Sequence, residues 1–409
     1  MKEDRKMTSR ERVLAAANHK PVDMMPIDFG ACGASGINVL AYNQLKKHLG
    51  LDLGPTKIYD VNQQLALPDI EVIDRFGGDA LELTQGFEVN GVVNENWQNW
   101  ELKDGSTCLV PVTFNPVMNE KGEWELKDGN LTLSRMPADG WYFDQVHIRY
   151  KDITSIEELD KIVMPSISDA QISFLKAKAK SMFETTDKAI SFAFSGSILE
   201  RSFHCFGHER FFMDLATDPE FVHAWHKKLS ENHLSNLKRV IDAIGEYIQI
   251  IIFGDDLGTQ NAPLISPNMY REMIKPYHKL QYRYVRDNYP DIKVFLHSCG
   301  AIFDLIPDLI DAGVEILNPV QISCVGMEAQ KLKREFGKDL TFWGGGANMQ
   351  HTVVYDSLKG IKDEVRHLIE VFHKDSGYIF NQVHNIQANI SPEKIIAIYD
   401  TALAFRKEH

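Results

Sequence analysis

The sequence predicts one (β/α)8 barrel domain over residues 1–409, with an antiparallel β-hairpin insertion at 88–150 after the second strand. From residue 189 onward, six strand-like segments are each followed by a helical segment. These strands are near-continuous apolar runs, which is typical of parallel strands covered on both faces. Two earlier segments complete the set, so we expect the eight strands at 24–29, 78–84, 189–196, 247–256, 293–297, 314–319, 340–346 and 377–381.

Residues that cap first turns mark the expected helices. Thr8 and Glu11 have the spacing of a capping box, which predicts that the first helix begins there and runs to about residue 18. Asp218 followed by Pro219 places an N-cap residue before a proline at the first helical position, a usual helix start. From these and similar signals we expect helices at 8–18, from 155, and at 198–215, 218–244, 266–288, 298–311, 327–336, 355–373 and 391–407.

The segment 92–150 differs in composition from the alternating strands and helices after it, because it has four tryptophans and repeated Asp-Gly or Lys-Gly turns. The hexapeptide WELKDG occurs at 100–105 and again at 124–129, and each Asp-Gly lies between strand-like runs, which is a hairpin signal. Two copies of a hairpin turn are more often two hairpins than a binding repeat, so we interpret this block as an antiparallel insertion. Its tryptophans also offer a contact surface for a homodimer.

Composition and charge limit the classes of partner. The chain has 44 basic and 57 acidic residues, a net charge of −13 and no block of Lys or Arg, which argues against nucleic acid or an anionic membrane as partner. Its first residues are charged and no run of about 18 apolar residues occurs, so neither export nor membrane insertion is expected. The five cysteines form no CxxC pair, as expected for the reducing cytoplasm.

Polar residues gather where the predicted strands end. In a (β/α)8 barrel the active site lies at the carboxyl ends of the strands, and polar groups at that mouth seldom serve packing. We therefore expect a functional cleft there, with a small molecule as substrate. Its candidate residues are Asp28, Glu82, Gln85, Ser195, Asp255, Asp256, Gln260, His297, Cys299, Asn318, Gly344–Gly346, Asn348, Asn381 and His384.

His297 and Cys299, at the end of the fifth strand, indicate a metal site. Strand residues two apart point to the same side, with Cα atoms roughly 6.6 Å apart. This spacing suits one Zn²⁺, which bonds nitrogen at about 2.0–2.1 Å and sulfur at about 2.3 Å. A catalytic zinc takes three protein ligands, and His384 after the last strand is the third candidate. The alternative is that His297 is a satisfied core histidine and Cys299 a small buried hydrophobe.

Other strand-end residues are expected to contact substrate or cofactor. We expect Asp255, Asp256 and Gln260 to be catalytic, by polarising or positioning the substrate, or by bringing one carboxylate to the metal. The alternative for the two aspartates is a favourable charge effect before a helix. The residues expected to bind the cofactor are Asp28, Ser195, Asn318 and Asn348.

From the third strand to the C-terminus, and more loosely before it, the chain resembles the uroporphyrinogen decarboxylase superfamily. This superfamily of (β/α)8 barrels includes the haem-pathway decarboxylase and zinc methyltransferases. The residues His297-Ser298-Cys299-Gly300 match the His-x-Cys-Gly motif that supplies two zinc ligands in the methyltransferase branch. The third ligand in that branch is a cysteine after the last strand. His384 stands at that position here, and the decarboxylase branch also has a histidine there.

The decarboxylase branch binds its polycarboxylate substrate with arginines just after the first strand, in a Met-Arg-Gln-Ala-Gly-Arg stretch. This chain has MMPIDFGACGASG there, and no basic residue occurs between Lys20 and Lys46. A polyanion without an arginine clamp would be poorly held. Haem-pathway decarboxylation is therefore not expected.

The resemblance implies a zinc-dependent methyltransferase that moves a methyl group between a corrinoid and a thiol or related acceptor. The methyl-corrinoid (cobalamin) would be a co-substrate carried on a partner protein. Two alternatives stay open, because the fold alone does not decide function. One is a metal-free, decarboxylase-like lyase that uses Asp255 or Asp256 with His384, and the other is a non-catalytic corrinoid or tetrapyrrole binder.

Overall fold

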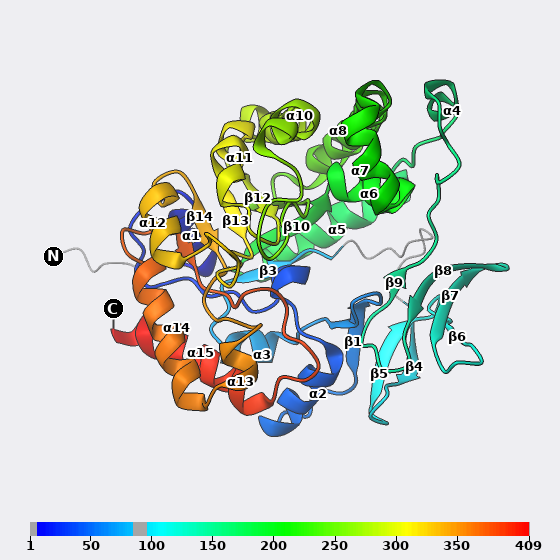
Figure 1. Cartoon of the computed structure of the whole chain (residues 1–409). Coiled ribbons are helices and arrows are strands. Elements are labelled where there is room, and N and C mark those ends of the chain that lie inside the picture. The colour runs from blue at the N-terminus through cyan, green and yellow to red at the C-terminus, as the bar shows by residue number, and fades with distance from the viewer. Residues whose placement is uncertain (1–5, 85–95, 409) are drawn as a thin grey trace.

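The computed structural model describes residues 6–84 and 96–408. A seven-stranded parallel sheet forms its centre, in the order β15-β14-β13-β12-β11-β10-β3, with helices around it (Figure 1). Each of these strands lies within a segment that the sequence predicts as a strand. Their bounds are β3 Ala80–Glu82, β10 Ala189–Ser195, β11 Ile250–Gly254, β12 Lys293–His297, β13 Ile316–Asn318, β14 Thr341–Trp343 and β15 Tyr378–Ile379.

The ring closes through Ile27, in the segment predicted as the first strand. Ile27 forms parallel bridges to Phe380, next to β15, and to Gly78, next to β3. The amide of Asp28 donates to the Phe380 carbonyl at 2.8 Å, and the amide of Asp79 donates to the Ile27 carbonyl at 2.7 Å. The first strand is thus reduced to a bridge, yet it fills the eighth position and confirms the (β/α)8 barrel.

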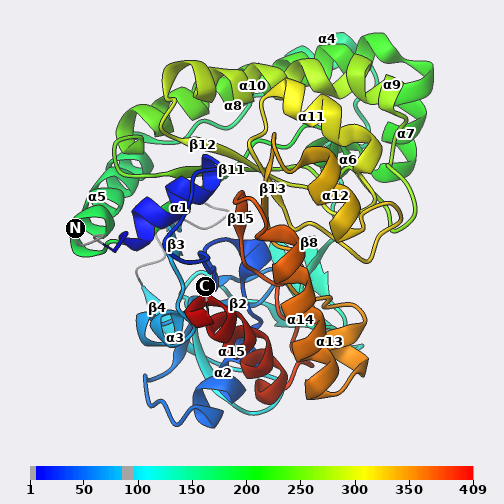
Figure 2. The same ribbon diagram turned by 90° about the vertical axis from the view of Figure 1, so that its left-hand side faces the viewer.

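Helices cover the outside of the barrel, with α8 and α10 on one side and α14 and α15 on another (Figure 2). The capping box of Thr8 and Glu11 is present, and Asp218 caps the helix that begins at Pro219, as predicted. No helix within the described residues has the length and apolar character needed to cross a membrane. The helices are α1 Ser9–Ala17, α2 Val39–His48, α3 Ile70–Arg75, α4 Ile156–Asp160, α5 Asp169–Thr185, α6 Leu199–Phe206, α7 His208–Thr217, α8 Pro219–Ile244, α9 Pro267–Met269, α10 Lys275–Asn288, α11 Ile306–Ala312, α12 Ala329–Phe336, α13 Thr352–Tyr355, α14 Leu358–Phe372 and α15 Pro392–Glu408.

Some helices differ from the sequence-based expectation. The single helix expected at 198–215 is two helices, α6 and α7, because Gly207 between them has a φ of 86° that no α-helix continues. Helices α2, α3 and α5 were not predicted. Ser168 and Gln171 form a capping box at α5, so the start of that helix was readable from the sequence.

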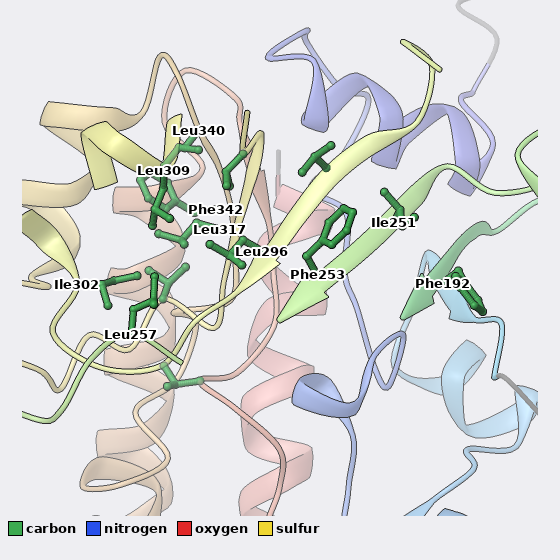
Figure 3. Packing of buried hydrophobic residues seen from close by; sticks show 14 of the residues in the cluster. Phe192, Ile251, Phe253, Leu257, Leu296, Ile302, Leu309, Leu317, Leu340 and Phe342 are labelled. Carbon is green, nitrogen blue, oxygen red and sulfur yellow. The ribbon is translucent and has the colours of Figure 1, made fainter. Parts of the chain in front are cut away.

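The strands are buried on both faces, as their apolar sequences predict. Ile250 and Ile252 of β11 belong to an interior cluster with Trp343, to which every strand of the central sheet contributes. Ile251 and Phe253 point the other way and pack against the surrounding helices (Figure 3). Full burial of one such side chain contributes about 1.5–3 kcal/mol. Packing on both faces therefore holds the strands, and with them the positions of their ends.

Two four-stranded sheets lie beside the barrel (Figure 1). Both WELKDG hairpins are confirmed, as β4–β5 and β7–β8. One sheet, in the order β2-β1-β5-β4, also contains strands that precede β3 in the chain, so one continuous insertion does not build it. The expected start of the insertion at 88, like Gln85, lies outside the described residues. The strands are β1 Thr56–Asp60, β2 Leu65–Ala66, β4 Trp97–Glu101, β5 Thr107–Pro111, β6 Val117–Met118, β7 Trp124–Asp128, β8 Leu131–Met136 and β9 Asp144–Gln145.

A buried carboxylate holds the closing bridge of the barrel. Asp79 accepts hydrogen bonds from Arg12 of α1 at 2.6 Å, from Arg406 of α15 at 2.8 Å and from the amide of Ile27 at 3.0 Å. Its side chain is only 2% exposed, so water screens these interactions little. Asp79 therefore links the first helix, the last helix and the first strand position through hydrogen bonds to a single side chain.

Asp79→Ala should lower the free energy of unfolding by about 3–5 kcal/mol, because it leaves the buried Arg406 without its carboxylate and removes one of the two carboxylates, Asp23 and Asp79, that pair with the buried Arg12. Urea unfolding followed by circular dichroism measures this change. As a control, Arg366→Ala removes an exposed pair with Glu408 and should lower the same free energy by at most about 1 kcal/mol. Equal effects of the two substitutions would contradict the role given to Asp79.

Candidate metal centre

The three predicted metal ligands meet at the mouth of the barrel. His297 is the last residue of β12, Cys299 follows two positions later, and His384 lies in the loop after β15. One donor atom of each lies within 4.8 Å of the others. Sγ of Cys299 is 3.5 Å from Nε2 of His297, and the two imidazole centroids are 5.5 Å apart. The structure thus brings together the ligand set chosen from the sequence.

Asn318, at the end of β13, orients the ring of His297. The Asn318 side-chain amide donates to the Trp343 carbonyl at 2.8 Å, so Oδ1 is the atom that accepts from Nδ1 of His297 at 2.7 Å. In the neutral ring the proton therefore lies on Nδ1, and Nε2, which faces Cys299, keeps its lone pair. Asn318 was expected to bind the cofactor directly. The structure places it fully buried behind His297 instead.

His384 is oriented in a similar way. Its backbone is left-handed, with a φ of 61°, a conformation that non-glycine residues keep only where the surroundings fix it. Nδ1 of His384 is 3.0 Å from Oδ1 of Asn385, whose own amide donates to Gln63 at 3.0 Å. Burial, and then the charge of His297, lower the pKa of His384 to about 4. The ring is therefore neutral near pH 7, which is the form of histidine that binds metals.

Cys299 lies where its thiolate is costly without a nearby cation. Burial, and then the carboxylate of Asp256, raise the pKa of the thiol well above its usual range. Asp256 accepts the amide of Cys299 at 2.8 Å, and its Oδ1 lies 3.6 Å from Nε2 of His297. A divalent cation among these groups would stabilise thiolate and carboxylate together. Nitrogen and sulfur donors of this kind fit Zn²⁺.

Two glycines let the loop after β11 reach the metal centre. Gly300 has a φ of 96°, and a Cβ atom on it would come within 2.3 Å of the backbone of Gly258. Across this contact the amide of Ala301 donates to the Thr259 carbonyl at 2.7 Å. The glycine of the His-x-Cys-Gly pattern therefore permits a close backbone approach, which places Asp256 beside the predicted ligands.

The adjacent residues Asp255 and Asp256 have different surroundings. Asp255 is fully buried, and its oxygens accept the amides of residues 198–200 at 2.7–3.0 Å and Nε2 of His278 at 2.8 Å. Burial alone would raise the pKa of Asp255, but these hydrogen bonds lower it overall. Asp255 therefore caps α6, and of the two aspartates expected to be catalytic only Asp256 reaches the metal centre. The helix it caps precedes it in the chain, so its sequence neighbours gave no sign of this.

The other expected site residues are spread around the mouth. Gln260 is exposed and donates to a backbone carbonyl in the loop after β13 at 2.7 Å. Asn348 accepts two amides of its own loop at 3.1–3.2 Å, and both oxygens of the fully buried Asp28 accept internal donors at 2.7 Å. Ser195 is exposed at the end of β10. Among the four residues expected to bind a cofactor, it is the one that lines the cavity beside the metal centre.

That cavity has a volume of about 2200 Å³ and extends from His384 to the small sheets. Tyr59, Glu82 and Glu200 also line it, and Tyr59 donates to Glu82 at 3.0 Å. Burial raises the pKa of both carboxyl groups to about 7. A pocket for one small ligand usually has about 300–1,000 Å³, so this cavity has room for two. Glu200 was not predicted, because an acidic residue in a first helical turn is too common to be a signal.

Known proteins resemble this chain in sequence and in fold. The family model for uroporphyrinogen decarboxylase (URO-D) matches residues 139–405, which include the three predicted ligands. The uroporphyrinogen decarboxylase of Chlorobium limicola is 24% identical over 254 residues, 59% of this chain and 68% of that protein. The one of Pelodictyon phaeoclathratiforme is 25% identical with the same coverage. A methyltransferase from Methanosarcina mazei shares the fold, with a TM-score of 0.60 and 14% identity over 98% of this chain and 99% of that one.

Asn318→Leu should weaken zinc binding roughly 10–100-fold, the usual cost of losing a hydrogen bond that orients a metal-binding histidine. Leucine is similar in size to asparagine but cannot accept the Nδ1 proton of His297. Titration of metal-free protein with Zn²⁺ against a chelating indicator measures the dissociation constant. Asn348→Leu, which removes hydrogen bonds of a separate loop, should leave zinc affinity unchanged. A similar loss in both variants would refute the specific role of Asn318.

Proposed function

The chain belongs to the uroporphyrinogen decarboxylase (URO-D) family, and we propose that it is a zinc-dependent methyltransferase within this family. The proposed reaction moves a methyl group between a corrinoid, carried on a partner protein, and a thiol or related acceptor. The observation that carries the proposal is the meeting of His297, Cys299 and His384, with donor atoms within 4.8 Å of one another. The fold shared with the methyltransferase from Methanosarcina mazei agrees with it.

The side chains at the mouth would hold the metal and manage the proton of the thiol. His297 and His384 would offer the lone pairs of their Nε2 atoms, and Cys299 its sulfur. Zinc bound there would supply a Lewis acid that lowers the pKa of a thiol toward neutrality. Oδ1 of Asp256, 3.6 Å from Nε2 of His297, is suited to accept the proton that the thiol loses.

The proposed transfer is a displacement at carbon. The thiolate sulfur forms a bond to the methyl carbon while the cobalt–carbon bond breaks, and the electron pair of that bond stays on cobalt. Methylcobalamin thus becomes cob(I)alamin and the thiol becomes a methyl thioether, so no further oxidant or reductant is needed. A cavity of about 2200 Å³ offers room for the acceptor together with part of a corrinoid.

Two further expectations belong to this proposal. We place the protein in the cytoplasm, because a reducing compartment keeps thiol substrates and cysteine ligands reduced. We also propose that the small sheets form a homodimer contact, because Trp141 and Tyr142 there are 41% and 46% exposed.

Protein purified without chelator should contain close to one zinc per chain. Cys299→Ala and His384→Ala should each weaken zinc binding at least 10–100-fold, because each removes a donor atom. His384→Cys should retain zinc, since thiolate and imidazole are both good tetrahedral ligands. Elemental analysis and zinc titration measure these changes. Cys108→Ala, in β5 of the small sheets, is the matched control and should bind zinc like the unsubstituted protein.

The same variants test methyl transfer. The assay is anaerobic methyl transfer from methylcobalamin to 2-mercaptoethanol, measured by the absorbance of cob(I)alamin. Cys299→Ala and His384→Ala should lose this activity because they lose zinc. Unchanged zinc affinity in His384→Ala would remove His384 from the ligand set and leave Asp256 as the next candidate. An unsubstituted protein that stays metal-free after reconstitution with Zn²⁺ would overturn the proposal.

A decarboxylase-like lyase is the second candidate, favoured by the activity that names the curated relatives. The sequence between Lys20 and Lys46 has no basic residue to clamp a polycarboxylate, so uroporphyrinogen should not be decarboxylated at a useful rate. Chromatography of the oxidised porphyrin products measures this. Formation of coproporphyrinogen at a kcat of about 1–10³ s⁻¹, typical of enzymes, would reverse the ranking of the two functions. Corrinoid binding without any turnover would indicate the non-catalytic alternative.

A further inference from the structure

The large cavity contains a second group of side chains that the metal centre does not use. We propose that Arg149 and Arg201 form an oxyanion-binding subsite, which selects a small molecule with a negatively charged group such as a carboxylate. This inference rests on the proposed function, since it names the substrate class of the same cavity. Its test needs neither zinc nor methyl transfer.

The two arginines come from segments that are joined by a hydrogen bond. Arg201 lies in α6, one helical turn before Cys205, and the amide of Tyr150, next to Arg149, donates to the Cys205 carbonyl at 2.8 Å. Both arginines line the cavity. Burial raises the pKa of the Cys205 thiol to about 11, and the charges of Arg201 and Arg149 both oppose that rise. Both guanidinium groups are therefore close to the same thiol.

Neither guanidinium forms a hydrogen bond or an ion pair in the part of the chain that the structure describes, although the charge of Arg201 acts on its chain neighbour Glu200. Twelve of the fourteen arginines there form an ion pair or a hydrogen bond, and the two others are Arg149 and Arg201. Arg210 in the neighbouring α7, for example, pairs with Asp214 at 3.0 Å. A free guanidinium offers donors in a planar fork that matches a carboxylate or phosphate group.

The cavity also differs in charge from the chain as a whole. Burial raises the pKa of Glu82 and of Glu200 to about 7, so these carboxyl groups carry only part of a negative charge near neutral pH. Nδ1 of His233, on the same wall, is buried without a hydrogen-bond partner among the described residues, and a ligand hydroxyl would satisfy it. The whole chain has 44 basic and 57 acidic residues. The cavity instead is lined by five basic residues (Lys57, Lys127, Arg149, Lys178 and Arg201) and four acidic residues (Asp60, Glu82, Asp144 and Glu200).

The subsite suits a small anion better than a polycarboxylate. Two guanidinium groups can hold one or two carboxylates, and the half-buried Phe174 and Phe194 on the cavity wall offer apolar surface for the rest of the ligand. The segment after the first strand supplies no basic residue. The residues proposed to bind the anion lie elsewhere, with Arg201 in α6 and Arg149 in the chain before α4. The geometry points to a small carboxylate with an apolar body.

Calorimetric titration of the full-length, metal-free protein tests the subsite, with sodium benzoate as probe and benzamide as its neutral match. Benzoate should bind at least ten-fold more tightly than benzamide. Arg149→Gln and Arg201→Gln should each weaken benzoate binding roughly ten-fold or more, because each removes a hydrogen bond to a charged group, and should leave benzamide binding unchanged. Arg334→Gln, which removes the same charge beside the exposed Glu335, is the control and should change neither.

Inorganic phosphate, titrated at the same ionic strength, identifies the oxyanion. Tighter binding of benzoate than of phosphate supports a carboxylate ligand. Tighter binding of phosphate, weakened by the same two arginine substitutions, supports the subsite but identifies its ligand as a phosphate. Equal binding of benzoate and benzamide, or an equal effect of Arg334→Gln, would overturn the subsite. Zinc content after reconstitution separates the two proposals: zinc without benzoate preference refutes the subsite alone, and benzoate preference without zinc refutes the methyltransferase proposal alone.

Discussion

Closure of the barrel depends on the hydrogen bonds that Pro26, Ile27 and Asp28 make to both neighbouring strands, since Ile27 bridges β15 and β3 in the described structure. Asp79 fixes this bridge by accepting the Ile27 amide together with two arginines from the first and last helices. A closed ring of parallel strands puts all their carboxyl ends on one side. His297 on β12 and the loop after β15 that carries His384 therefore lie at the same mouth of the barrel.

At the candidate metal centre, burial keeps the His384 ring neutral and the Cys299 thiol protonated. A bound cation would favour the first state and reverse the second. The neutral state of His384 already suits a metal, whereas the raised pKa of Cys299 holds its thiol protonated until a positive charge offsets the burial and the Asp256 carboxylate. Asn318 and Asn385 accept the Nδ1 protons, so both Nε2 lone pairs are free. Orientation is thus built into the protein, and the divalent cation of the proposal would supply the missing charge.

The family barrel leaves function to the residues around its mouth. The relatives in sequence are decarboxylases and the similar structure is a methyltransferase, so this one fold accompanies two chemistries. In this chain the small sheets extend the cavity beyond the barrel, and Arg149 and Arg201 enter it from segments that the barrel strands do not supply. If the proposed subsite selects the substrate, that choice rests on parts of the chain that can change without disturbing the ring of strands.

The sequence by itself determined the barrel strands, the caps at Thr8 and Asp218 and the set of candidate ligands, because apolar runs and capping residues act over a few neighbouring positions. The tertiary structure alone decided that Asp255 caps α6 while Asp256 faces the candidate ligands, and that the residues lining the cavity include Glu200 and two arginines that form no ion pair within the described residues. These roles depend on which distant segments pack together. Local periodicity fixes which face of a segment is buried, but only the packed fold fixes which donor meets which acceptor.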